Sequence, residues 1–151
     1  MPHVRTQIRD AVVAMVTDLE TTGRNVYPSR SFSLDDAELP SLSVYTVDEG
    51  SDEVVTKITL AKPAKVHRTC PLVIEGHTKG NDDIDAALDQ ISLEVETALS
   101  AVLRIGAREL STQLQSTGKS SFFDGEDEVG IVRLVYTIPY VTAENTPGVI
   151  E

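Results

Sequence analysis

The segment Gly130–Val141, GIVRLVYTIPYV, carries the strongest strand signal in the chain. Branched and aromatic residues follow one another closely in it, as is typical of β-strands. Apart from Arg133 and Thr137, its central part is apolar on both faces. A strand that is apolar on both faces is covered on both sides, so we expect this segment in the interior of a sheet or in an interface.

Five other segments upstream, four strands and one connection, are interpreted from their local pattern. Pro40 biases Leu39 toward extended geometry, so a strand is expected to begin at Ser41 and reach Tyr45. Pro71 interrupts a later strand and favours an edge or bulged position for it, because proline donates no ladder hydrogen bond. The strand that contains Pro71 is expected at Val66–His77. Further strands are expected at Glu53–Leu60 and Glu109–Ser116. The segment Thr117–Val129 is interpreted as a polar connection.

Two helices are predicted from apolar residues at three- and four-residue spacing. The first runs from Val4 to Glu20, with Gly23 as a stop signal just beyond it. The second covers roughly residues 82–104, with an Asx cap and acidic residues in its first turn. Its apolar seam runs from Ile84 to Val102, and Gly106 is interpreted as its stop signal.

Length and composition indicate one α/β (α+β) domain. The chain has 151 residues, of which 40% are hydrophobic and 25% charged, and these values are ordinary for a globular protein. Residues 1–141 are expected to form the domain, and residues 142–151 a flexible C-terminal tail. One cysteine excludes an internal disulfide framework, and no apolar run reaches membrane-spanning length.

A catalytic or metal site receives no positive support from the residues. His67, Cys70 and His77 are metal-ligating types, but on a continuous strand the histidines share a face while the cysteine points away. We therefore expect a small buried thiol and two surface histidines. Neither a G-x-S-x-G elbow nor a phosphate-binding glycine motif occurs, so we expect no enzyme, no cofactor and no metal.

The charge pattern is compatible with two interpretations. A net charge of −11 disfavours binding to the outside of nucleic acid, where Lys and Arg supply the affinity. The acidity either keeps the chain soluble, or it forms a surface that DNA passes without sticking. Lys62, Lys65 and Arg68 are correspondingly either solvated side chains or a docking patch for an acidic subunit.

Two loops are candidates for subunit contacts. One is the acidic tip Asp48–Glu53, and the other is Phe122–Glu128, in which two phenylalanines precede Gly125. Exposed phenylalanines suit a buried anchor in an assembly, and the alternative is that both fold back onto their own core. The candidate interface residues are Asp48, Glu49, Asp52, Glu53, Lys62, Lys65, Arg68, Phe122, Phe123 and Arg133.

Three blocks in order resemble the tail terminator proteins of long-tailed phages, the minor tail protein U family. The first block contains Tyr27, Arg30, Asp35-Asp36 and then Leu39-Pro40-x-Leu42-x-Val44-Tyr45. The second contains Arg68, Leu72-Val73-Ile74, Leu88-Asp89-Gln90-Ile91 and Glu94-Val95-Glu96-x-Ala98-Leu99. The third is Val135-Tyr136-Thr137-Ile138-Pro139-Tyr140. Together they cover about two thirds of the chain, whereas the loop 117–127 and the last ten residues do not match the pattern.

The resemblance implies a mixed, largely antiparallel twisted sheet packed with the N-terminal helix and one long helix. It also implies a homo-hexameric ring on the head-proximal end of the tail tube, which stops tube polymerisation and offers the head-joining surface. The implied partners are the tail tube protein and a neck or connector protein, and DNA passes through the pore without specific binding. The implied location is the virion tail, assembled in the host cytoplasm without a membrane. A neck or head-completion protein is the alternative.

Overall fold

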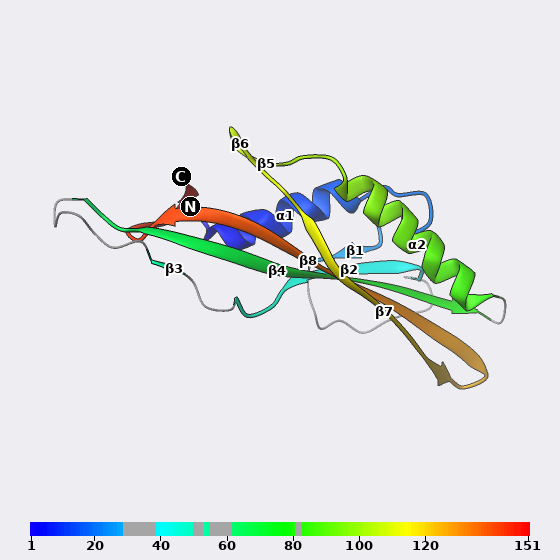
Figure 1. Ribbon diagram of the computed structural model, residues 1–151. Coiled ribbons are helices and arrows are strands. Elements are labelled where there is room, and N and C mark those ends of the chain that lie inside the picture. Colours follow the sequence, from blue (N-terminus) through cyan, green and yellow to red (C-terminus); the bar gives the residue numbers. More distant parts are fainter. Residues whose placement is uncertain (29–38, 50–52, 55–61, 81–82) are drawn as a thin grey trace.

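The computed structural model describes residues 1–28, 39–49, 53–54, 62–80 and 83–151. Within these residues, two helices lie along the same side of a seven-stranded mixed sheet (Figure 1). One strand pair in this sheet is parallel and the others are antiparallel. The predicted α+β class and the largely antiparallel sheet are therefore confirmed. Neither helix in the described ranges has the length and apolarity needed to cross a bilayer.

The sheet is built on the pairing of two long strands, β4 (Lys65–Gly80) and β8 (Asp127–Ala143). All 16 residues of β4 have an antiparallel partner in β8, from Lys65 opposite Ala143 to Gly80 opposite Glu128. The segment 130–141 thus lies inside the sheet, as its two apolar faces predicted.

The remaining strands occupy the two outer edges of this pair. On the free edge of β4 lie β2 (Ser41–Thr46) and β3 (Glu53–Val54), and β1 (Val26–Tyr27) pairs with β2 in parallel. On the free edge of β8 lie β7 (Gln113–Asp124) and β9 (Thr146–Ile150). A separate hairpin is formed by β5 (Leu103–Ile105) and β6 (Arg108–Leu110). The predicted strand at residues 41–45 is confirmed, and the part of the predicted Glu53–Leu60 strand after Val54 lies outside the described residues.

The edge or bulged position expected for Pro71 is wrong, because β4 is the central strand between β2 and β8. Its ladder with β2 ends at the pair Thr46 and Leu72, one residue before the proline. The Pro71 carbonyl still accepts a hydrogen bond from the Val47 N–H at 3.1 Å. Because proline has no N–H, only the reciprocal hydrogen bond from residue 71 to β2, at the end of this ladder, is missing. A central strand can therefore accommodate the residue.

The first helix, α1, spans Val4–Val16 and is shorter than the predicted Val4–Glu20. It ends because Thr17 adopts an extended conformation and Asp18 has a φ of 65°, in the left-handed region that aspartate tolerates better than most residues. Leu19 nevertheless packs against the core, which is why the apolar periodicity continued past the end of the helix. The buried face of α1 consists of Val4, Ile8, Val12 and Val16.

The second helix, α2, spans Ile84–Leu99, with the Asp83 carboxylate accepting a hydrogen bond from the Ala86 N–H at 3.0 Å. The predicted cap is confirmed, but the helix ends well before residue 104. Val102 is 53% exposed and follows the helix, and Gly106 lies in the β5–β6 turn rather than at a helix end. The buried face of α2 consists of Leu88, Ile91, Val95 and Leu99.

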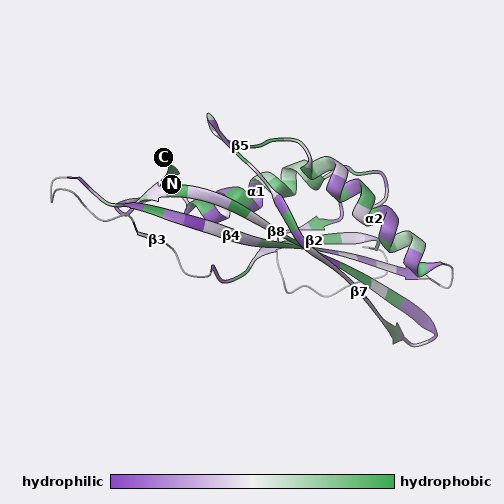
Figure 2. Cartoon of the chain, viewed as in Figure 1, coloured by the Kyte–Doolittle hydropathy of each residue, from purple (hydrophilic) through white to green (hydrophobic). Residues whose placement is uncertain are grey.

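Two glycines allow α2 to approach the sheet closely. A Cβ atom added to Gly76 of β4 would lie 2.7 Å from the Ile91 side chain, and one added to Gly130 of β8 would overlap the Ile84 side chain. Alternate apolar residues of β4 and β8 belong to the same buried core as the inner faces of the helices. Figure 2 shows hydrophobic and hydrophilic bands along the strands and helices. Helix α2 therefore packs on backbone as well as on side chains.

Three sequence predictions for the C-terminal half differ from the structure. The expected strand Glu109–Ser116 is divided between β6 and β7, and most of the expected connection Thr117–Val129 is the strand β7. The expected flexible tail also has defined structure: Thr142 and Ala143 belong to β8, and β9 folds back along it. The Gln7 amide on α1 donates to the Gly148 carbonyl at 2.7 Å, so this end of the chain packs against the N-terminal helix.

The position of Ile91 makes the packing of α2 testable. Ile91→Asp should unfold the domain or lower its free energy of unfolding by at least about 4 kcal/mol, because a carboxylate would be buried without a partner. Leu93→Asp is the matched control, since Leu93 is 57% exposed on the same helix and its replacement should cost less than about 1 kcal/mol. Urea unfolding followed by circular dichroism measures both values, and equal stability of the two variants would contradict the assigned core face.

Candidate assembly interface

The β7–β8 hairpin extends beyond the helices (Figure 1). Every residue of β7 is exposed, so the strand adds nothing to the core and is held by its ladder with β8. The hairpin reverses between Asp124 and Asp127, which face each other, through Gly125 and Glu126. Gly125 has a φ of 68°, a conformation that glycine adopts without steric cost.

The hairpin end carries two exposed phenylalanines. Phe122 is 48% exposed and Phe123 is 72% exposed, so the alternative that both fold back onto the core is wrong. Successive strand residues point to opposite faces. Phe123 is paired with Glu128 and shares the face on which α2 lies, whereas Phe122 is paired with Val129 and points to the other face. We refer to residues 122–128 as the hairpin tip.

Two lysines fix the direction of the hairpin. Lys119 on β7 contacts the carboxylates of Asp85 and Asp89 on α2 at 2.6 and 3.0 Å. Hydrogen bonds to these carboxylates raise the pKa of Lys119, Asp85 being the larger cause. Lys79, near the end of β4, contacts Asp124 at 3.2 Å and Asp127 at 3.7 Å across the base of the turn. These lysine contacts hold the hairpin tip in one position relative to the rest of the domain.

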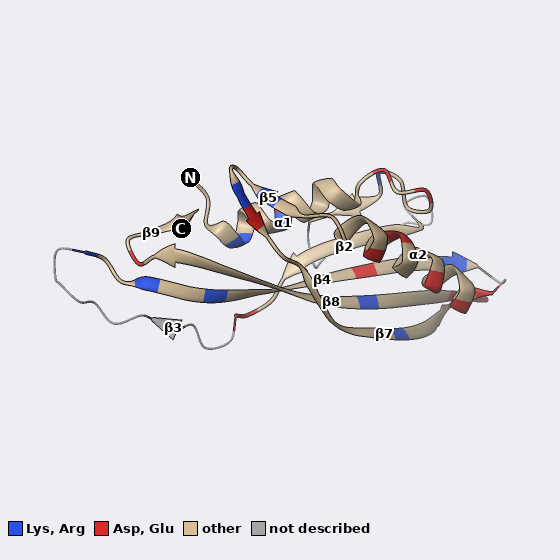
Figure 3. Ribbon diagram, turned by 45° about the horizontal axis from the view of Figure 1, so that its top comes forward, with Lys and Arg blue, Asp and Glu red and all other residues tan. Residues whose placement is uncertain are grey.

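The basic candidates lie elsewhere on the sheet. Lys62 and Lys65 are exposed near the start of β4, where Figure 3 shows positive residues at the end of the strand opposite to the hairpin tip. Arg68 is half-buried, and its Nε atom donates to the Thr142 hydroxyl at 3.2 Å. Arg133 is exposed on β8, on the face opposite to α2. The structure thus places Lys62, Lys65 and Arg68 toward the end of the sheet opposite to the acidic tip, and Arg133 between the two ends.

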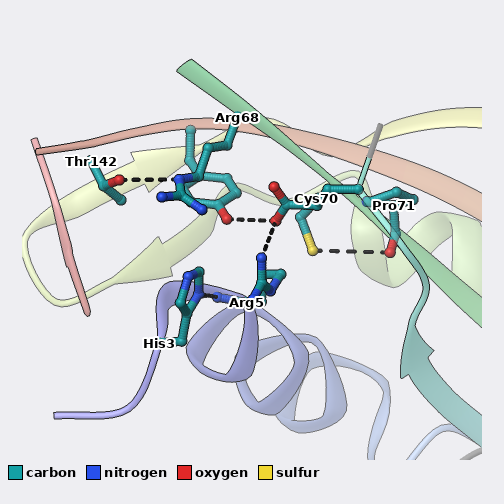
Figure 4. A network of polar contacts seen from close by, with 8 residues as sticks. His3, Arg5, Arg68, Cys70, Pro71 and Thr142 are labelled. Atoms are coloured by element: carbon teal, nitrogen blue, oxygen red, sulfur yellow. Dashed lines mark hydrogen bonds and ion pairs between the residues drawn. The ribbon is translucent and has the colours of Figure 1, made fainter. Parts of the chain in front are cut away.

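The acidic candidates Asp48 and Glu49 differ in how far their side chains are exposed. Asp48 is exposed, whereas the Glu49 side chain is only 5% exposed. The Tyr140 hydroxyl donates to the Glu49 carboxylate at 2.6 Å, and the Arg5 guanidinium lies 3.4 Å from it. Figure 4 shows this network between α1, β4 and β8. Glu49 is thus engaged within its own chain.

The other two acidic candidates are described only in part. Glu53 is in β3, where its backbone pairs with His67, and Asp52 lies outside the described residues.

The metal-ligating side chains do not converge. Cys70 belongs to the core cluster, while His67 is exposed at the other face of β4. His77 is buried, at 6% exposure, which corrects the expectation of a surface residue. Desolvation lowers the pKa of His77, against the opposing effect of Glu75. In the part of the chain that the structure describes, no group of three such side chains could hold an ion.

A groove lies where the C-terminal end of α2 faces β6 and β7. It consists of two adjoining hollows of about 380 and 270 Å³, both lined by Leu99, Ser100 and Thr112. The Thr112 hydroxyl donates a hydrogen bond to the Leu99 carbonyl at 2.9 Å, and both residues line both hollows. We call this the α2–β7 groove. Sequence analysis missed it, because neither the end of α2 nor the start of β7 was placed correctly.

Two large aliphatic side chains of the α2–β7 groove are exposed, Val102 in the larger hollow and Leu114, beside Tyr136, in the smaller one. Val102 is 53% exposed and Leu114 is 42% exposed, so the groove presents an apolar surface to solvent. Burial raises the pKa of Tyr136 to about 12, with the Glu96 carboxylate as a second cause. The hydroxyl therefore stays protonated at neutral pH and is a hydrogen-bond donor.

Burial also makes the reactivity of Cys70 testable. Desolvation, with Glu49 as the next cause, raises the thiol pKa from 9.0 to about 12. Because only the thiolate is nucleophilic, the folded protein should not react with a thiol reagent at pH 8, and unfolding in urea should restore the reaction. Reaction of the native protein at the rate of the unfolded chain would contradict the burial of Cys70.

The raised pKa of Cys70 also predicts that the free energy of unfolding falls at alkaline pH. The folded state holds the Cys70 proton more tightly than the unfolded state, so this contribution is complete below pH 9 and declines as the pH rises toward 12. The free energy of unfolding should therefore fall between pH 9 and 11. In Cys70→Ala the fall should be smaller, and urea titrations at several pH values measure the two slopes.

Comparison with known proteins finds little similarity in sequence. No protein-family model matches the chain, and a search of curated proteins finds no match. Among solved structures, the chain is similar to one chain of the virion of a native gene transfer agent particle. The two are 18% identical, the alignment covers 91% of this chain and 90% of that one, and the TM-score is 0.46.

Proposed function

We propose that this chain is a virion structural protein, a phage tail terminator that forms a homo-hexameric ring on the head-proximal end of the tail tube. The ring stops tube polymerisation, presents the surface that joins the neck or connector protein, and leaves a pore for DNA. The proposal rests on the three sequence blocks that resemble this family, together with one structural observation, the exposed hairpin.

The observation that carries the proposal is the β7–β8 hairpin with its phenylalanine tip. A strand of 12 residues that is exposed on both faces is held to its own domain by its ladder with β8, by two lysine contacts and by a hydrogen bond from the Gln115 amide to the Thr137 hydroxyl. An exposed strand edge is an aggregation hazard that soluble monomers usually cover or shorten. Exposed aromatic side chains are the residue type that anchors protein interfaces. Both features are explained if neighbouring subunits cover the hairpin.

A pore function requires several copies, because one domain of this size cannot enclose a DNA duplex. Head-to-tail contacts that repeat and close give a ring, and the resemblance favours six copies. Six copies carry 6 × 11 = 66 excess negative charges. A lumen that is acidic or neutral repels phosphates, so a duplex can move through it without being retained.

The proposed ring is tested by sedimentation at high protein concentration and by electron microscopy of tail tubes mixed with the protein. We expect hexamers in one or both experiments and capped, length-limited tubes. Dimers alone, together with uncapped tubes, would exclude the ring. Rings that bind isolated necks but leave tubes free to grow would favour the neck or head-completion function.

Phe123 tests whether the hairpin tip is an interface. Phe123→Ser should fold with a free energy of unfolding within about 0.5 kcal/mol of the original chain, because the side chain is largely exposed. The same variant should no longer form rings or cap tubes, because the assembly loses an aromatic anchor. Leu93→Ser is a matched control on α2, away from the tip, and should still assemble. An unfolded Phe123→Ser monomer would instead assign the side chain to the core.

Salt should weaken assembly. Lys62, Lys65 and Arg133 are exposed and can pair with acidic side chains of a neighbour, and such pairs are screened within about 8 Å at physiological ionic strength. The concentration at which half of the protein is assembled should rise between 50 and 500 mM NaCl. Duplex DNA should show no measurable binding at physiological ionic strength, and tight binding would favour a nucleic-acid-binding protein instead.

A further inference from the structure

Two exposed apolar features lie near opposite ends of β7, the hairpin tip and the α2–β7 groove. Register with β8 places Phe123 and Leu114 on the same face of the sheet, the face that carries α2. Nine residue steps separate them, or about 30 Å at the rise of a strand. Because β7 is fixed along β8 and to α2 through Lys119, the tip of a chain cannot reach the groove of the same chain.

The size and lining of the groove suit an aromatic side chain. Its two hollows of about 380 and 270 Å³ are open to solvent beside Val102, Leu114 and Tyr136. Among the described residues, no partner is found for the Tyr136 hydroxyl, although the residue is 4% exposed. An inserted phenyl ring would cover exposed aliphatic side chains of the groove, and a carboxylate or carbonyl beside it would accept a hydrogen bond from the Tyr136 hydroxyl.

The two features differ in charge, the tip being strongly acidic and the surroundings of the groove carrying cations as well as acids. The tip carries four acids, Asp124, Glu126, Asp127 and Glu128, and Lys79 is the basic side chain that contacts two of them. The β5–β6 hairpin beside the groove carries Arg104 and Arg108. Arg104 lies 3.0 Å from Glu109, which leaves Arg108 for an acid of another chain.

The acids of the groove are fewer than those of the tip. Glu96 and Glu109 line the groove, and Glu109 is the one already paired with Arg104. Close to the tip, by contrast, α2 presents Asp85 and Asp89. An incoming acidic tip is therefore repelled more at the N-terminal end of α2 than at the groove beside its C-terminal end.

We propose that the hairpin tip of one copy docks in the α2–β7 groove of the next copy, with Phe123 as the anchor. This inference deepens the proposed ring and rests on it. Each copy offers one tip and one groove on different parts of its surface, so the contact is heterologous and repeats head to tail until the ring closes. A phenylalanine buries roughly 150–250 Å², so the tip is the centre of a larger contact that includes the β7 edge.

Mixing two defective variants tests the direction of the contact. Phe123→Ser lacks the anchor but keeps the groove, and Leu114→Arg blocks the groove but keeps the tip. Each variant alone should raise the concentration needed for assembly about tenfold or more. A 1:1 mixture should form a heterodimer and nothing larger, because one functional contact remains per pair. Native mass spectrometry with one variant isotopically labelled identifies this species.

Cysteine cross-linking locates the docked tip. Phe123→Cys mixed with Leu114→Cys should give a disulfide-linked dimer under mild oxidation, because such a bond requires Cα atoms within about 7 Å. Cys70 is fully buried and does not interfere. Lys65→Cys is the control at the opposite, basic end of the sheet. Phe123→Cys alone tests whether two tips meet each other.

The outcomes separate this inference from the proposed function. Rings or capped tubes in which Phe123→Cys links to Lys65→Cys, or to a second tip, would overturn the docking site and leave the terminator function in place. The same conclusion would follow if Leu114→Arg formed rings as well as the original chain. If neither rings nor capped tubes form with the unmodified protein, the proposed function fails together with the inference.

Discussion

The structure depends on the complete pairing of β4 with β8. Sixteen consecutive residue pairs give a ladder of about 53 Å at a rise of 3.3 Å per residue. Four strands attach directly to this ladder, β2 and β3 on one edge and β7 and β9 on the other, and β1 attaches through β2. Each helix is shorter than the ladder, about 20 Å for α1 and about 24 Å for α2.

That difference in length explains why one part of the sheet is exposed. The helices and the sheet form a core along the ladder, held by close approach of α2 to Gly76 and Gly130. Beyond the N-terminal end of α2, neither helix of the described part of the chain covers the hairpin, and every residue of β7 at its outer edge is exposed. The exposed tip and the open groove at the other end of α2 are both consequences of a helix that covers only part of the strand beside it.

The polar contacts divide into those that complete the domain and those that remain for an assembly. Glu49 is surrounded by Tyr140, Arg5 and Cys70, and this burial links the end of β2 to α1 and β8. Lys79 and Lys119 use acidic partners to hold the hairpin against the body. Arg108, Arg133 and the acids of the tip remain at the surface, where they provide the charge pattern on which subunit docking would depend.

The sequence by itself determined the parts of the fold that bury an apolar surface. The two helix faces, the strand from Ser41 and the interior strand 130–141 follow from periodicity, because burial selects apolar residues at the period of the element. Tertiary structure alone decided most of β7, all of β9 and the C-terminal ends of both helices. Residues 117–121 are polar, all of 117–124 are exposed, and they become a strand only because β8 offers an edge for hydrogen bonding. No alternation of residue types marks such a strand, so its position cannot be predicted from the sequence. The exposure of the phenylalanines and the shape of the groove depend on that position, and they are therefore set only when distant segments pair.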